Sequence, residues 1–230
     1  MSASIKSQEQ LLFHGWREHC RSHAQDGFVA DGLVNEEAYS ASRQKVLFVL
    51  KDTVGDLANY DKDLCEFIRH GARGPTFNNL TRWLKGIRGL PERIPWDQLA
   101  KTLKTTDDND PSDARANELL SAAFMNIKKG PGKSKAKYPH LWKAADRDRL
   151  YIQRQFLLYD PDITICCGTD YYFVEMVLGH PKSIWNHTTD TVRFFEREPG
   201  KFIVAYRHPQ SHYTVKTLYS DLMSALYEIL

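Results

Sequence analysis

The feature that most constrains the fold is an apolar run from Val46 to Leu50, which is followed at once by Lys51 and Asp52. A run of this length that is rich in Val and Phe and ends in a turn is typical of a strand buried on both faces, as in the centre of a parallel sheet. In open α/β sheets the ligand crevice lies beyond the carboxyl ends of the strands. Asp52 is therefore predicted to lie where such sheets bind ligands.

Three other apolar runs share this character, and segments with helical periodicity separate them. The four predicted strands span residues 45–50, 121–127, 162–167 and 201–206. The predicted helices span residues 5–24, 61–70, 76–87, 96–103, 113–120, 141–159 and 213–229, with one more that ends at residue 178. Thr76 is expected to cap its helix, and residues 192–196 are expected to pair with the last strand. The pattern predicts an α/β protein, a three-layer α/β/α fold with a central four-stranded, mainly parallel sheet.

The length of 230 residues suits one large α/β domain or two small ones, and the sequence shows neither an internal repeat nor a linker. We expect a single domain over residues 1–230, in which residues 1–44 form an N-terminal helical extension and residues 45–228 form the core. The net charge of +2 is too small to indicate a polyanion partner by itself, so the distribution of charge matters more.

Several classes of protein are disfavoured by the sequence. No apolar run approaches the ~20 residues needed to span a bilayer, and the first ten residues contain no signal-peptide core. The cysteines form no CxxC pair, which disfavours zinc and iron–sulfur sites. They are Cys20, Cys65, Cys166 and Cys167. We expect a monomeric cytoplasmic protein that needs no metal, cofactor or membrane.

Polar residues follow all four predicted strands. They are Lys51 and Asp52 at the first strand, Asn126, Lys128 and Lys129 at the second, Gly168 and Thr169 at the third, and Arg207, His208 and Ser211 at the fourth. Parallel strands bring these groups to one edge, where a carboxylate, a carboxamide and an imidazole suit polar recognition and electrostatic catalysis. Each residue alone has a plainer interpretation. The position of Asp52 by itself favours a helix cap, Asn126 suits a turn, and His208 suits an exposed site before proline.

The segment of residues 128–137 carries five lysines and is interrupted by a Gly-Pro-Gly sequence. The lysines are Lys128, Lys129, Lys133, Lys135 and Lys137. Lysines on a loop beside a cleft suit a phosphate backbone, although a solvated basic loop is a common alternative. Residues 132–134 resemble the end of a P-loop, but Ile127 stands where that motif needs glycine, so nucleoside triphosphate hydrolysis is disfavoured.

The order of these short motifs resembles that of the uracil-DNA glycosylase superfamily, over roughly residues 45–228. LKDTV matches a first strand that ends in a motif with Asp, and GPTFNNL matches a Pro-containing segment that ends in Asn and an aliphatic residue. AFMNI matches a strand ending in Asn, TICCG a strand ending in Gly, and HPQSH a His-Pro-Ser-like motif. The resemblance implies a four-stranded parallel sheet between helices. It also implies a monofunctional DNA glycosylase, which flips a base out of double-stranded DNA and hydrolyses its N-glycosidic bond.

The resemblance also implies roles for individual residues. Asp52 would position water and stabilise the cationic sugar, and His208 would stabilise charge on the departing base. Asn126 would hydrogen-bond the edge of the flipped base, on which Phe67 would stack. Lys51, Val54 and Gly55 are expected beside the base. Besides the five lysines, DNA contacts are expected from Thr76, Asn78, Asn79, Gly168, Thr169, Gln210, Ser211, His212 and Tyr213.

One departure from the family pattern bears on the substrate. Uracil-specific members carry a bulky aromatic residue just after the Asp motif, whereas this chain has Thr53, Val54 and Gly55, which leave room for a substituent at C5. One branch that the chain resembles removes glucosylated 5-hydroxymethylcytosine from phage DNA as antiviral defence, and this base is expected here. Candidates for contacts with the sugar are Lys51, Asp56 and Asn59. The alternatives are a uracil or mismatch repair glycosylase and a non-catalytic nucleic-acid-binding module on the same fold.

Overall fold

A computed structural model of the chain describes residues 3–23, 27–53, 63–101, 112–132 and 138–230. Its centre is a mixed seven-stranded sheet in the order β1-β3-β2-β4-β7-β6-β5. The strands are β1 (Gly32–Leu33), β2 (Val46–Leu50), β3 (Ala122–Asn126), β4 (Ile163–Cys167), β5 (Asn186–His187), β6 (Arg193–Glu198) and β7 (Lys201–Tyr206). Strands β3, β2, β4 and β7 are parallel to one another, while the remaining pairs, β1 with β3, β6 with β7 and β5 with β6, are antiparallel.

The predicted α/β class is confirmed, and the four predicted strands are the four parallel ones. The prediction of a four-stranded sheet is wrong, because β1, β6 and β5 extend the sheet with antiparallel pairs. The predicted pairing of residues 192–196 with the last strand is confirmed by β6, which pairs with β7 from Arg193 opposite Ala205. Strands β1 and β5 have two residues each, too few to produce an alternating apolar pattern.

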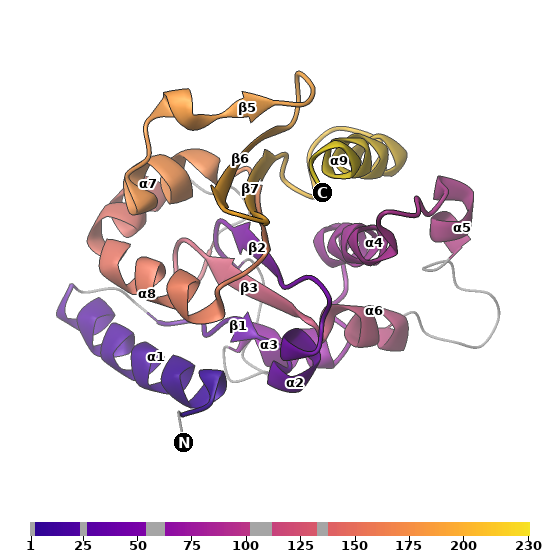
Figure 1. The fold of residues 1–230 in the computed structure, drawn as a ribbon. Helices are drawn as coiled ribbons and strands as arrows, with labels where there is room; N and C mark the ends of the chain where they lie inside the picture. The colour runs from indigo at the N-terminus through magenta and orange to yellow at the C-terminus, as the bar shows by residue number, and fades with distance from the viewer. Residues whose placement is uncertain (1–2, 24–26, 54–62, 102–111, 133–137) are drawn as a thin grey trace.

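Helices cover both faces of the sheet. They are α1 (Ile5–Ser22), α2 (Glu36–Ser40), α3 (Leu64–Arg69), α4 (Pro75–Gly89), α5 (Trp96–Lys101), α6 (Ser112–Leu119), α7 (Tyr138–Arg147), α8 (Arg149–Tyr159), the π-helix η2 (Tyr171–Leu178), the 3₁₀-helix η3 (Lys182–Ile184) and α9 (Val215–Ile229). Helices α1, α7 and α8 lie on one side of the strands, and α4, α6 and α9 lie on the other (Figure 1). None of the helices in the described ranges has the length and apolar character needed to cross a bilayer.

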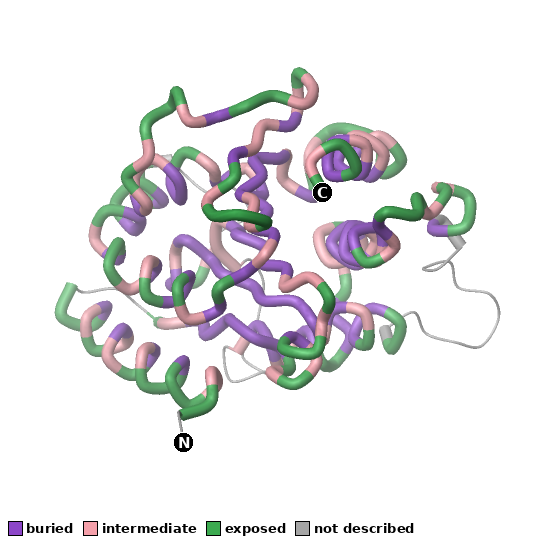
Figure 2. The backbone as a smooth tube through the Cα atoms, viewed as in Figure 1, coloured by how far each residue is buried: buried purple, intermediate pink, exposed green. Residues whose placement is uncertain are grey.

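Strand β2 shows why the sheet lies between two apolar layers. All five of its residues are buried. Phe48 packs in the cluster that includes α4 and α9, whereas Leu47 and Val49 pack in the cluster that includes α1, α8 and η2. Side chains alternate between the faces of a strand, so a strand covered on both sides must be apolar throughout. The strands in Figure 2 are accordingly buried along most of their length.

Two of the differences between the predicted and the observed helices have a clear local cause. Helix α4 starts at Pro75 rather than being capped by Thr76, because Gly74 is its N-cap and proline suits the first helical turn. The single helix predicted over residues 141–159 is two helices, α7 and α8, divided at Asp148. Asp148 is fully buried and accepts hydrogen bonds from the Arg147 guanidinium, and its backbone leaves helical geometry (ψ 9°).

The N-terminal segment packs into the same layers as the rest of the chain. Strand β1 pairs with β3, placing Gly32 opposite Phe124. The Trp16 ring of α1 stacks on the Tyr151 ring of α8, with centroids 5.4 Å apart. Residues of the predicted N-terminal extension thus contribute to the sheet and to one of its two apolar layers.

Candidate functional site

The carboxyl ends of β3, β2, β4 and β7 lie side by side in that order, because the four strands are parallel. We call this edge the rim. The rim consists of Asn126 and Lys128 at β3, Lys51 and Asp52 at β2, Gly168 at β4, and Arg207 and His208 at β7. The expected convergence of polar residues from four strands is therefore present in the fold.

Asp52 is held against the loop that follows β3. Its side chain is only 7% exposed. A Cβ atom added to Gly132 would lie 2.6 Å from Asp52 Cγ, so the glycine backbone packs directly on the carboxylate. The Gly132 N–H donates to the Thr53 carbonyl over 2.7 Å and holds the two segments together. Position 132 therefore needs a residue without a side chain.

Burial raises the pKa of the Asp52 carboxyl, and the ammonium groups of Lys128 and Lys51 oppose this rise. Lys128 Nζ lies 3.9 Å from Asp52 Oδ2, beyond direct hydrogen-bond distance. The interpretation of Asp52 as a helix cap does not apply to α3. That helix is capped by Asp63, whose carboxylate accepts the backbone N–H groups of Cys65 and Glu66.

Asn126 is buried, with 1% of its surface exposed. Its side-chain amide donates to Thr53 Oγ1 over 2.9 Å, and its backbone N–H donates to Asp31 Oδ2 over 2.7 Å. Its side-chain oxygen Oδ1 has no hydrogen-bond partner among the described residues. A buried acceptor without a partner is costly, so a ligand that offers an N–H group would relieve this cost.

The backbone position of Asn126 depends on a buried network, which consists of Glu9, Asp31, Lys129, Gln155 and Tyr159. Lys129 Nζ donates to both oxygens of Asp31 at 2.7 and 2.6 Å and to Gln155 Oε1 at 2.9 Å. Gln155 also donates to Asp31 and to the Tyr159 hydroxyl, which in turn donates to Glu9. The network thus connects helices α1 and α8 to the end of β3.

His208 is a neutral imidazole of one defined tautomer. Burial, together with the positive charge of Lys51, lowers the pKa of His208 to about 4. The Gln210 backbone N–H donates to Nδ1 over 3.1 Å, so Nδ1 is the acceptor nitrogen. The ring proton of the neutral form must then lie on Nε2. His208 can therefore donate one hydrogen bond from Nε2 at neutral pH.

We expect the His208 ring to titrate near pH 4 and to show an unprotonated Nδ1 above that pH, which a ¹⁵N–¹H NMR titration would measure directly. Because the pKa lies below the ordinary 6.5, the folded state binds fewer protons than the unfolded state between these values. Stability should thus fall as the pH drops from about 6.5 to about 4, and His208→Asn should remove that part of the pH dependence. A His208 titration near pH 6.5 would contradict the assignment.

Gly168 lies at the rim between the end of β2 and the end of β7. Its φ of +68° is favoured by glycine. A Cβ atom there would lie 3.7 Å from His208 Cβ and 3.8 Å from Lys51 Cε. The end of β4 therefore lies between Lys51 on one side and His208 on the other.

Three residues predicted to contact DNA have buried side chains, which are therefore not accessible to DNA in this structure. Lys129 is fully buried in the network described above. Thr169 is also fully buried, and its hydroxyl donates to the Val49 carbonyl over 2.8 Å. Asn79 is 4% exposed and donates from its side chain to the Pro209 carbonyl over 2.7 Å. Asn79 thereby tethers the loop that carries His208 to α4.

The other predicted contacts are more accessible. Lys128, Thr76, Asn78 and Ser211 are half-buried, and Gln210, His212 and Tyr213 are exposed. The Arg207 guanidinium lies 3.8 Å from the centroid of the Tyr213 ring. Phe67 is half-buried and packs edge to face with Phe77, with ring centroids 5.6 Å apart, and its stacking on a base stays a prediction. Val54, Gly55, Asp56, Asn59, Lys133, Lys135 and Lys137 lie outside the described residues.

Sequence reasoning missed the residues that support the site. Asp31 is a lone acidic residue in a loop, and nothing in its neighbourhood indicates a partner 98 positions away in Lys129. Gly132 carried a signal, because its Gly-Pro-Gly context predicts a close backbone approach. The group approached is Asp52, within the chain itself.

No protein-family model matches this sequence, and no curated protein matches it significantly. Among the described residues, no group of three or more His, Cys, Asp or Glu side chains is arranged to hold a metal ion. The residues at the rim are therefore the basis for assigning a function.

Proposed function

We propose that this chain is a monofunctional DNA glycosylase, which flips a modified pyrimidine out of DNA and hydrolyses its N-glycosidic bond. The observation that carries the proposal is the combination found at the rim. A nearly buried carboxylate, a buried amide oxygen without a partner among the described residues and a neutral imidazole lie at the carboxyl ends of the parallel strands β2, β3 and β7. Each supplies one requirement of the reaction.

The reaction develops positive charge on the sugar and negative charge on the departing base. Water adds to C1′ of the sugar as the bond to the base nitrogen breaks, and the base leaves with the bonding electrons and then takes up a proton. The Asp52 carboxylate suits the positive end, since it is largely removed from bulk solvent and forms no ion pair closer than 3.9 Å with any residue in the described ranges. It also suits the orientation of the attacking water and acceptance of a proton from it.

His208 suits the negative end of the same reaction. A neutral ring that donates from Nε2 stabilises charge on a carbonyl oxygen of the base without first needing a proton from solvent. The adjacent Lys51, close enough to Gly168 and His208 to lower the pKa of the imidazole, adds positive charge on that side. The two charges of the transition state thus have separate partners on β2 and β7.

Asn126 suits the reading of the base. Its Oδ1, which has no partner in the described part of the chain, would accept an N–H group from the pyrimidine edge, such as the exocyclic amine of cytosine or the ring N–H of uracil. A base inside a duplex cannot reach a buried side chain, so recognition requires that the nucleotide be flipped out. The exposed residues Gln210, His212 and Tyr213 follow His208 directly and suit contact with the DNA around the flipped nucleotide.

For the base itself we propose a cytosine with a bulky 5-substituent, namely glucosylated 5-hydroxymethylcytosine of phage DNA, which makes the protein an antiviral enzyme. The support is the small Thr53 after Asp52 and the absence of a ring in the sequence at Val54 and Gly55. The Thr53 hydroxyl also accepts a hydrogen bond from the Asn126 side chain, so Thr53 helps to shape the base site.

The decisive experiment is a base-release assay on duplexes that differ at a single nucleotide. The panel contains cytosine, uracil, 5-hydroxymethylcytosine and its glucosylated form. Released bases are identified by mass spectrometry, and abasic sites by alkaline strand cleavage. We expect release of the glucosylated base by the unmodified protein and by Asp146→Asn, a control that changes an exposed carboxylate on α7. Release of uracil alone would overturn the antiviral assignment but not the glycosylase. Tight DNA binding with no base released from any substrate would overturn the glycosylase proposal.

A further inference from the structure

A pocket of about 570 Å³ opens beside the rim, and the proposed reaction does not use it. It is lined by Pro139 and Trp142 of α7, by Gly168 at the end of β4, and by Tyr171 and Tyr172 at the start of η2. Asp52, Asn126 and His208 are not among these lining residues. The pocket is therefore distinct from the groups assigned to base recognition and bond cleavage.

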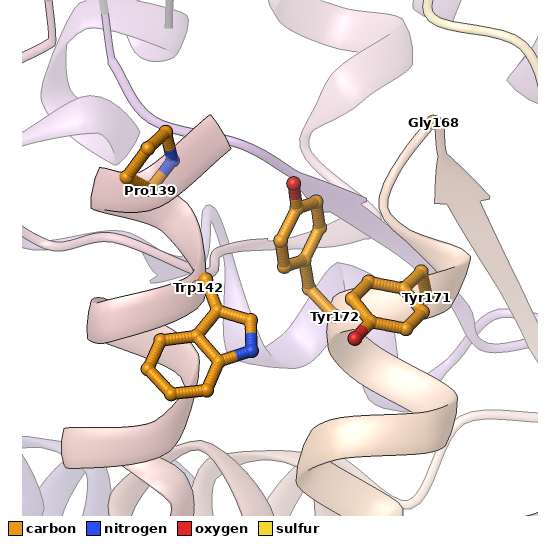
Figure 3. A pocket seen from close by; sticks show the side chains of 5 residues that line it. All are labelled: Pro139, Trp142, Gly168, Tyr171 and Tyr172. Atoms are coloured by element: carbon orange, nitrogen blue, oxygen red, sulfur yellow. The ribbon is translucent and has the colours of Figure 1, made fainter. Parts of the chain in front are cut away.

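The lining is aromatic on two sides and mostly carbon. Figure 3 shows the rings of Trp142 and Tyr171 projecting from the two helices toward the space between them, with the Tyr172 ring between the two. Trp142 is 49% exposed and Tyr171 is 41% exposed. The rings of Tyr171 and Tyr172 meet edge to face, with centroids 5.4 Å apart. Aromatic faces that remain open to solvent at a pocket suit a planar ring as ligand.

Gly168 connects the pocket to the rim. It lines the pocket, and an added Cβ atom would also contact His208 and Lys51. A ligand that enters the pocket therefore lies next to the position where the proposed reaction holds its nucleotide. In a bound DNA strand, the nucleotide next to the target nucleotide would therefore be the one that reaches this pocket.

We propose that this pocket binds a second nucleobase of the DNA strand, unstacked beside the target nucleotide and held against Trp142 and Tyr171. A nucleobase fits better than a hexose. Sugar hydroxyls need several hydrogen-bond partners and a mostly carbon lining supplies few, whereas a stacked base can keep its polar edge in water. The choice of DNA as the source of the base rests on the proposed function, but stacking itself can be measured without catalysis.

The test measures binding of two single-stranded oligonucleotides of equal length and charge. One is oligothymidylate, and the other has the same phosphodiester backbone without bases. We expect Trp142→Ala and Tyr171→Ala each to weaken binding of oligothymidylate by about 5- to 150-fold. Binding of the strand without bases should stay unchanged. Trp142→Phe, which retains a ring, should keep most of the affinity.

Two controls separate stacking from general effects. Leu150→Ala removes another apolar side chain on this side of the fold, 64% exposed on α8, and should not alter binding of either strand. The salt dependence of binding should be the same for Trp142→Ala and the unmodified protein, because no phosphate contact is lost. Trp142 is the one exposed tryptophan among the described residues, so quenching of its fluorescence on binding gives a second measurement.

The outcomes distinguish this inference from the proposed function. Loss of oligothymidylate affinity in both alanine variants would support the pocket even if the protein released no base. Unchanged affinity in both variants would overturn it even if base release were efficient. Equal weakening for the strand with bases and the strand without them would also overturn it.

Discussion

Replacing Asp52 with Asn should lower the rate of base release by about 10²–10³-fold or more, while DNA affinity stays nearly unchanged. The substitution keeps the shape of the side chain and removes the negative charge that faces the developing cation. An interaction made only in the transition state changes turnover rather than binding. Single-turnover kinetics and equilibrium binding on the same duplex would measure the two quantities separately.

The same substitution should raise the stability of the fold at neutral pH. Burial raises the pKa of Asp52 in the folded state above the 3.8 of the free side chain, so the ionised group costs stability as the pH rises through the folded pKa. Asn carries no such cost. Denaturant unfolding at pH 4 and pH 7 should show the larger gain at pH 7. Near-normal turnover in Asp52→Asn would contradict the catalytic role of the carboxylate.

Lys129→Met should destabilise the protein by about 3–5 kcal/mol, because it leaves the Asp31 carboxylate buried without its cation. Both side chains of the pair are fully buried, and Lys129 Nζ also lies 4.6 Å from the centroid of the Trp16 ring. Urea unfolding followed by fluorescence would measure the loss. In thermal unfolding, each kcal/mol should correspond to roughly 2–4 °C in Tm for a chain of this size.

Two further variants make this prediction specific. Asp31→Asn combined with Lys129→Met removes both charges and should recover part of the lost stability, since no buried charge is left unpaired. Lys201→Met breaks a surface ion pair, in which Lys201 Nζ lies 2.6 Å from Asp160 Oδ1. This substitution should lower the stability far less. Equal losses in Lys129→Met and Lys201→Met would mean that Lys129 does not carry a buried charge.

The parallel strands could be predicted from the sequence because burial on both faces demands a continuous apolar run. Val46–Leu50 shows the run, and β3, β4 and β7 repeat it. The edge strands could not be predicted. A strand of two residues, such as Asn186–His187, is too short for any periodicity, and both of its side chains are exposed.

The candidate site could be predicted in part, for a related reason. The polar residues that follow the strands are visible in the sequence, and topology brings Asp52, Asn126 and His208 to one edge. Which of two adjacent lysines faces solvent depends on a partner distant in the chain. Lys128 lies near Asp52 at the rim, whereas Lys129 turns inward to Asp31, and the sequence shows two equal lysines.

The lengths of the two edge strands have a consequence outside the site. The sheet ends at β1 on one side and at β5 on the other, each only two residues long. A sheet edge with many free N–H and C=O groups is a template on which a second chain can add a strand, which is a common start of aggregation. Two residues offer too few of these groups for stable pairing. Strands β1 and β5 are thus poor templates for strand addition, although they flank four central parallel strands that are almost entirely apolar.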